Sequence, residues 1–146
     1  MTRTRVAGWS VGLLFLLAAK VHAAEPARVL MLHAFNYSFP ATSVIAEAAR
    51  KRLVQHSKSI EIDAEFLDLA RNTDEAHSLR MASYIRDKYE KYRPDIVITL
   101  GSSALPFVIK HRDMLAGVPV VFASISPQTY AALRPPPDMT PEGWFP

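Results

Sequence analysis

Four short segments of the chain carry a hydrophobic pattern typical of β-strands. Three of them, residues 28–34, 96–100 and 118–123, are almost uninterrupted apolar runs, as expected for strands buried on both faces of a sheet. The fourth, residues 59–68, alternates apolar and polar positions, which predicts a half-buried strand at a sheet edge.

The segments between these strands repeat apolar residues at helical spacing. The first helix is expected up to about residue 56, with Thr42 or Ser43 as its N-cap. The second opens on the Asn-Thr-Asp-Glu sequence at residues 72–75, which resembles a capping motif, and continues to about residue 92. The third is expected over residues 104–114. The inward-facing side chains are predicted to be Ile45, Ala49 and Leu53 in the first helix and Leu79, Ala82, Ile85, Tyr89 and Tyr92 in the second.

This strand–helix alternation with short connections predicts an α/β fold, in which a parallel, Rossmann-like sheet carries helices on both faces. Residues 24–134 are expected to form one ligand-binding lobe. In residues 135–146, five of the 12 positions are proline, and no strand or helix pattern is visible. We expect this tail to be a linker or the point at which the chain has been truncated.

Residues 1–23 have the pattern of a cleavable signal peptide. Arg3 and Arg5 precede the apolar run 11–19, and small residues stand at the two cleavage positions of Val21-His-Ala23. An uncleaved membrane anchor is the alternative, but the run is shorter than the roughly 20 residues that a spanning helix needs, and Lys20 interrupts it. We therefore expect export to the periplasm with cleavage after Ala23.

Removal of the signal peptide changes the charge of the chain. The full sequence has 17 basic and 14 acidic residues, and three of the basic residues (Arg3, Arg5 and Lys20) lie in the signal. The exported chain is thus expected to be neutral overall, and its charge does not favour nucleic acid as a partner. Cysteine is absent, which excludes disulfides, thiolate metal sites, thiol catalysis and lipid attachment through an N-terminal cysteine.

Candidate site residues gather where the predicted strands end. In open parallel sheets, ligands bind beyond the carboxyl ends of the strands. These ends carry His33-Ala-Phe-Asn-Tyr37, Asp68, Gly101-Ser-Ser103 and Ser124-Ile-Ser126. Gly101 permits a sharp turn, and Ser102 or Ser103 could cap the next helix, so that backbone N–H groups face a small polar ligand.

The same residues lack most of what catalysis requires. Leu105 stands where a nucleophile elbow needs its second glycine, and the histidines on the predicted helices have no i, i+4 partner for a metal. Neither a phosphate-loop lysine nor a dinucleotide-binding glycine motif is present, so no cofactor is expected. A small secreted serine hydrolase that uses Ser102 or Ser103 with His33 stays open as an alternative.

Three segments together resemble a bacterial periplasmic binding-protein family. They are Arg28-Val-Leu-Met-Leu-His-Ala-Phe-Asn36, the stretch from Arg93-Pro-Asp to Ala104, and Val118-Pro-Val-Val-Phe-Ala-Ser-Ile-Ser-Pro127. The family comprises substrate-binding proteins of ABC importers, and the same module occurs as the extracytoplasmic sensor domain of some histidine kinases. The resemblance covers residues 28–134 and implies one lobe of a two-lobe fold with a small ligand held between the lobes.

The resemblance also implies the binding residues and partners. Family contacts from the loops after the first, third and fourth strands carry over to Asn36, Tyr37, Ser102, Ser103 and Ser124, and Gly101 shapes the turn between them. A membrane permease, or a membrane-embedded kinase in the sensor alternative, is the implied partner. Residues 136–140 resemble a segment that leads into the second lobe in relatives, so we expect this chain to be a fragment that binds its ligand poorly alone.

Overall fold

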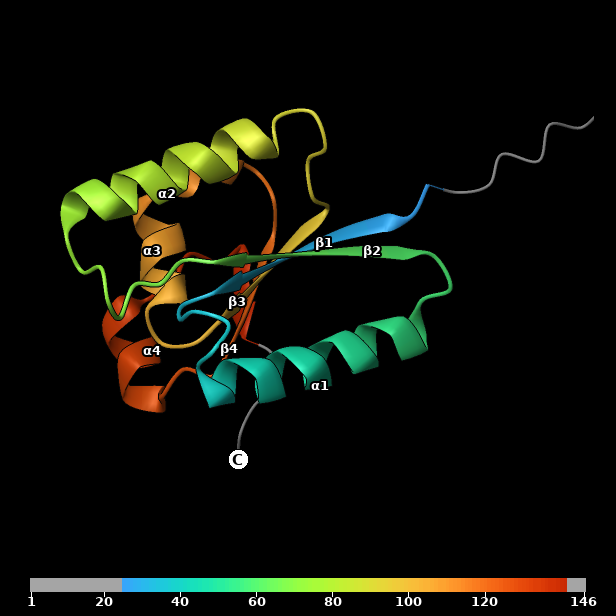
Figure 1. The fold of residues 1–146 in the computed structure, drawn as a ribbon, viewed down its shortest axis with the longest axis horizontal. Coiled ribbons are helices and arrows are strands. Elements are labelled where there is room, and N and C mark those ends of the chain that lie inside the picture. The colour runs from blue at the N-terminus through green and yellow to red at the C-terminus, as the bar shows by residue number, and fades with distance from the viewer. Residues whose placement is uncertain (1–24, 142–146) are drawn as a thin grey trace, which may run out of the picture.

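The computed structural model describes residues 25–141 as a single sheet with helices on both faces (Figure 1). The predicted signal peptide and the last five residues lie outside the described part. The elements, in chain order, are β1 (Ala27–His33), α1 (Pro40–His56), β2 (Ile60–Phe66), α2 (Glu75–Lys88), β3 (Ile96–Leu100), α3 (Ala104–Lys110), the 3₁₀ helix η1 (Arg112–Leu115), β4 (Val120–Ala123), α4 (Pro127–Leu133) and β5 (Met139–Pro141).

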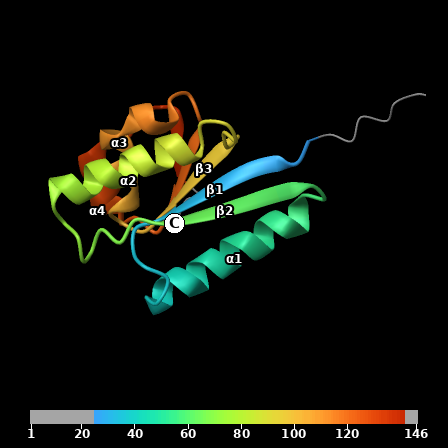
Figure 2. The ribbon, with the colours of Figure 1, turned by 45° about the horizontal axis from the view of Figure 1, so that its top comes forward.

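The sheet confirms the predicted fold class. Its five strands are all parallel and follow the order β2-β1-β3-β4-β5. This is the doubly wound order in which the chain builds outward from β1 in both directions, so the order reverses between β1 and β3. The strand at residues 60–66, with its alternating pattern, lies at one edge as expected. Figure 2 shows α1 on one face of the sheet and the α2–α3–α4 layer on the other.

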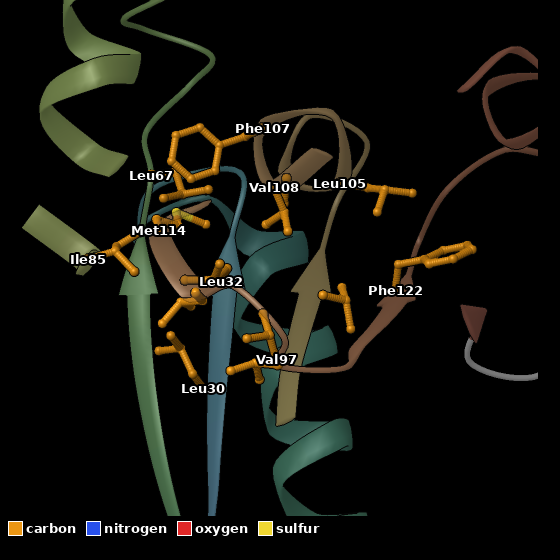
Figure 3. Packing of buried hydrophobic residues seen from close by; sticks show 14 of the residues in the cluster. Leu30, Leu32, Leu67, Ile85, Val97, Leu105, Phe107, Val108, Met114 and Phe122 are labelled. Carbon is orange, nitrogen blue, oxygen red and sulfur yellow. The ribbon is translucent and has the colours of Figure 1, made fainter. Parts of the chain in front are cut away.

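The larger hydrophobic core lies between the sheet and the layer of α2, α3, η1 and α4. Leu30, Leu32 and Val97 from the sheet meet Ile85 of α2 and Phe107 of α3 (Figure 3). All five are at most 4% exposed. Helices therefore cover this face of the sheet closely, and the buried side chains hold the strands in place.

The second core is smaller because α1 alone covers that face. Val29, Met31, Ile98, Leu100 and Ala123 are buried there. The inner stripe of α1 predicted from the sequence, Ile45, Ala49 and Leu53, packs against this cluster but is only half-buried.

Glu65 is a buried carboxylate at the edge of the larger core. Its Oε1 accepts hydrogen bonds from Lys88 Nζ at 2.5 Å and from Tyr89 Oη at 2.9 Å. These partners satisfy an acidic group that is only 8% exposed. Burial, followed by the bond to Glu65, raises the pKa of the Tyr89 phenol above its usual range.

The helix boundaries differ from the sequence predictions at three places. Helix α1 begins at Pro40, with Phe39 at the N-cap position, so neither Thr42 nor Ser43 caps it. Helix α2 is capped by Asp74, whose side chain accepts from the His77 N–H at 2.8 Å, but it ends at Lys88. The predicted third helix is divided into α3 and η1. The predicted inward-facing positions at the two ends of the second helix, Leu79 and Tyr92, are exposed.

The proline-rich tail contains a strand that its composition did not suggest. Strand β5 adds to the outer edge of β4 in parallel register, with Met139 beside Val120. Met139 is 4% exposed and belongs to the larger core. Within residues 25–141, no helix has the length and apolar character needed to cross a membrane.

Candidate functional site

The carboxyl edge of the sheet brings the predicted site residues to one end of the molecule. Strands β1 and β3 are neighbours, with His33 opposite Leu100, and the strand order reverses between them. The loops that follow these two strands therefore meet at the position where open α/β sheets bind ligands. The next strand, β4, pairs Ala123 with Leu100, so Ser124 follows at the same edge.

Gly101 is required where these loops meet. Its φ is +97°, and a Cβ at this position would lie 2.9 Å from Ala34 Cβ and 3.3 Å from the Phe35 ring. The Gly101 N–H donates to Ala123 O at 3.3 Å. Glycine thus allows the ends of β1, β3 and β4 to approach closely, which confirms the sharp turn expected from the sequence.

Two residues other than glycine also take left-handed backbone conformations at this edge. Asp68, two residues after β2, has a φ of 48°, and Ser124, directly after β4, has a φ of 61°. Such conformations cost of the order of 1–3 kcal/mol each in a non-glycine residue and concentrate at functional sites. Together with Gly101, they place a positive-φ residue just beyond three strands of the sheet.

Asn36 is engaged within the protein. Its Nδ2 donates to Asp68 Oδ1 at 3.1 Å, and its Oδ1 accepts from the Ser38 N–H at 3.0 Å and from Ser38 Oγ at 2.6 Å. Asn72 Nδ2 donates to the other Asp68 oxygen at 3.2 Å. Asn36 therefore links the loop after β1 to the loop after β2. The sequence predicts Asn36 as a ligand contact, and this positioning role is visible only in the structure.

The remaining predicted residues divide between the two faces of the sheet. Ser102 and Ser124 are exposed at the edge itself. Tyr37 is 74% exposed and turns toward the α1 side, where its ring meets Phe66 edge-on at 5.8 Å between centroids. Ser103 is half-buried on the α2 side and occupies the N-cap position of α3, although its hydroxyl makes no capping bond.

Ser103 lines a pocket of about 250 Å³ between α2 and α3. Ser78 and Lys110 line it as well, and Lys110 pairs with Glu75 at its rim. Ser78 Oγ lies 2.7 Å from His111 Nε2. This Ser–His pair leaves no signal in the sequence, because its members are 33 positions apart and only the packing of α2 on η1 brings them together.

A second pocket of about 440 Å³ lies between α1 and the β1–β2 edge. His33 lines it, stacked on Phe66 with 4.7 Å between ring centroids. The imidazole is 1% exposed, and its Nδ1 has no hydrogen-bond partner among residues 25–141. Burial lowers the pKa of His33, because it disfavours the charged form of the ring. In this structure His33 contributes to the α1 pocket, and Ser103 faces the pocket on the other side of the sheet.

The chemistry of this edge is hydrogen bonding and aromatic contact. Exposed hydroxyls come from Tyr37, Ser102 and Ser124, and the backbone turns sharply beside them. Within residues 25–141, no group of three or more metal-ligating side chains converges.

Comparison with known proteins gives no match: no family model, curated protein or solved structure matches this chain. The resemblance to periplasmic binding proteins stays a prediction drawn from the sequence segments quoted above.

Proposed function

We propose that this chain binds a small solute outside the cytoplasm, as the substrate-binding component of an ABC importer whose permease is its membrane partner. The observation that carries the proposal is the position of the strand-order reversal. It lies between β1 and β3, where the two loops pack closely at Gly101. Solute binding at this position is the general behaviour of doubly wound sheets.

The exposed groups at this edge support recognition of a small polar solute. Ser102 and Ser124 follow neighbouring strands that pair Leu100 with Ala123, and both serines are exposed. Ser124 has a left-handed backbone conformation, in which glycine would be unstrained. A non-glycine residue at such a position is typical of a functional site. We expect their hydroxyls to bond the solute.

The open form of this edge predicts weak affinity for the chain alone. Ser102 and Ser124 are both exposed, so a solute bound to them keeps a large part of its surface in water. Tight sites enclose most of their ligand. We therefore expect dissociation constants of about 1 mM or weaker until a second lobe or partner closes over the edge. A value of about 1 mM corresponds to a binding free energy of roughly −4 kcal/mol, and weaker binding is less negative.

Solution NMR with a panel of free amino acids tests the binding proposal, because it detects millimolar affinity. We expect saturable shifts of the Ser102 and Ser124 amide signals with at least one member of the panel. The double variant Ser102→Ala/Ser124→Ala should weaken that binding about tenfold, as expected for two lost hydrogen bonds at roughly 0.5–1.5 kcal/mol each. Ser83→Ala, on helix α2, is the matched control and should leave it unchanged. Shifts confined to residues outside the carboxyl edge would contradict the proposal.

Export is tested separately by expressing the full chain in a Gram-negative host. The periplasmic fraction should contain a protein whose mass corresponds to a chain that begins at Ala24. Leu14→Arg, which interrupts the apolar run of residues 11–19, should leave the uncleaved protein in the cytoplasm. An uncleaved wild-type protein in the cytoplasm would argue against an extracytoplasmic role.

A further inference from the structure

The pocket beneath α1 is separate from the serine-lined edge and has a composition of its own. Its volume of about 440 Å³ falls within the range of small-molecule sites. The floor consists of side chains from β1 and β2, all apolar except His33, and residues of α1 form one wall. Tyr37 is the only proposed binding residue of the edge that also lines it.

The floor of this pocket presents an aromatic platform. His33 and Phe66 stack with an angle of 17° between their rings, and Tyr37 stands perpendicular to Phe66. The His33 Nδ1 is buried without a partner among the described residues. Buried nitrogen atoms almost always have a partner, so an unpaired one in a pocket wall points to a group that arrives from outside.

The charged side chains at the rim indicate which group of a ligand could be bonded there. Arg50 and Glu47 both line the pocket, and neither forms an ion pair in the described part of the chain. Arg50 and Glu47 carry opposite charges, and Arg50 is the one that can bond an anion directly. Guanidinium groups also match carboxylates geometrically, with two parallel hydrogen bonds. The guanidinium of Arg50 can therefore hold a carboxylate at this rim.

We propose that the pocket between α1 and β2 binds a small planar carboxylate, whose ring packs against Phe66 and Tyr37 and whose carboxylate faces Arg50. This inference does not depend on solute binding at the serine-lined edge, because the pocket lies on the α1 face of the sheet and its lining includes neither Ser102 nor Ser124. The contribution of Arg50 is modest, since the residue is exposed and its charge is screened by solvent.

Titrations of the full chain with benzoate, benzamide and cyclohexanecarboxylate, followed by NMR, test the proposal. Benzoate should give saturable shifts of the His33 and Phe66 ring signals. Neutral benzamide should bind about fivefold more weakly, as expected for one solvent-exposed ion pair worth up to about 1 kcal/mol. The non-planar cyclohexanecarboxylate should also bind more weakly, because it loses the aromatic contacts. Equal affinity for benzoate and benzamide, or an absence of shifts at these rings, would overturn the proposal.

Substitutions of the two charged residues at the rim should change the affinity for benzoate in opposite directions. Arg50→Gln should weaken benzoate about fivefold and abolish its advantage over benzamide. Glu47→Gln should strengthen benzoate, whereas Arg52→Gln, in the same basic run but outside the pocket lining, should leave it unchanged. The reverse order of Arg50→Gln and Glu47→Gln would show that the site prefers a cation and would refute the assignment.

Filling the pocket gives an independent check. Ala64 lines the pocket and is exposed on the edge strand, so Ala64→Leu adds bulk without disturbing either core. We expect this variant to retain the wild-type dispersion of amide signals and to lose benzoate binding at least tenfold. Unchanged binding by the folded Ala64→Leu variant would exclude the pocket. The serine variants of the carboxyl edge should bind benzoate normally, which distinguishes failure of this proposal from failure of solute binding at that edge.

Discussion

The replacement of Gly101 by alanine is the sharpest test of how the carboxyl edge is built. Two separate effects act at this position. A φ of +97° is strained for any residue with a Cβ, and the added Cβ would lie 2.9 Å from Ala34 Cβ. Backbone strain of this kind costs about 1–3 kcal/mol, and overpacking costs typically about 1–3 kcal/mol more. We expect Gly101→Ala to lower the free energy of unfolding by about 2–6 kcal/mol in total.

Gly117 supplies the matched control for the backbone effect. Its φ is +82°, but a Cβ added there would meet no atom within 4 Å. Gly117→Ala should therefore cost only the strain, about 1–3 kcal/mol. Urea unfolding followed by circular dichroism measures both variants. If Gly101→Ala destabilises the protein no more than Gly117→Ala does, the close approach of β1 and β3 at this edge is not what requires glycine, and the argument fails.

Four further substitutions test other parts of the structure. Thr99→Val should stabilise the fold by about 1 kcal/mol in urea unfolding, because it removes a fully buried hydroxyl that has no partner among the described residues; equal or lower stability would show that the hydroxyl is satisfied. Tyr89→Phe should cost about 1–2 kcal/mol through loss of the bond to Glu65. Because the pKa of Tyr89 is raised in the folded protein, its contribution to stability is present below the ordinary phenol pKa of about 10 and is lost as the pH rises above that value. The free energy of unfolding of the Tyr89→Phe variant should therefore fall less steeply with rising pH than that of the wild type. Ser124→Gly should stabilise the chain by about 1 kcal/mol while weakening solute binding, whereas Arg134→Gly, at another left-handed position, should stabilise it without affecting binding.

The sequence predicted the fold class because its central strands leave a strong signal. Residues 96–100 are buried from both sides, so their apolar run is continuous, and the half-buried edge strand β2 alternates visibly. Strand β5 was missed because it is three residues long and stands among prolines. Its only buried side chain is Met139, which packs in the core beside Val120. A strand stabilised by tertiary contact alone has no local pattern to detect.

The error at the start of α1 has a different cause. Thr42 and Ser43 are common capping residues, and the cap was therefore placed there. The helix instead begins at Pro40, whose fixed φ and missing N–H suit the first turn. Thr42 is then buried within the helix, where it lines the pocket beneath α1. Proline at a helix start was the better local signal.

The roles of individual site residues depend on contacts between loops, which a single sequence does not reveal. Asn36 is predicted to contact the ligand, and the structure adds that its amide is bonded to Asp68, 32 residues away. The hydrogen bond between Ser78 and His111 likewise joins residues that are far apart in the sequence. Residue type indicated hydrogen-bonding capacity correctly in each case, but only the three-dimensional arrangement determines which partner uses it.

The alternation of side chains at the strand ends leads to a last prediction about the solute. Ser103 faces the pocket beside α2, and Tyr37 faces Phe66 on the α1 side, so one small molecule is poorly placed to contact both. Ser102 and Ser124 share the edge, because Leu100 pairs with Ala123 and Gly101 N–H bonds to Ala123 O. A solute bound at the edge should therefore shift the amide signals of Ser102 and Ser124 together, with equal apparent affinities in the NMR titration. The Ser103→Ala variant should bind it as the wild type does. If Ser103→Ala weakens binding as much as Ser102→Ala, the solute enters the α2 side of the sheet, and the edge above β3 and β4 is not its site.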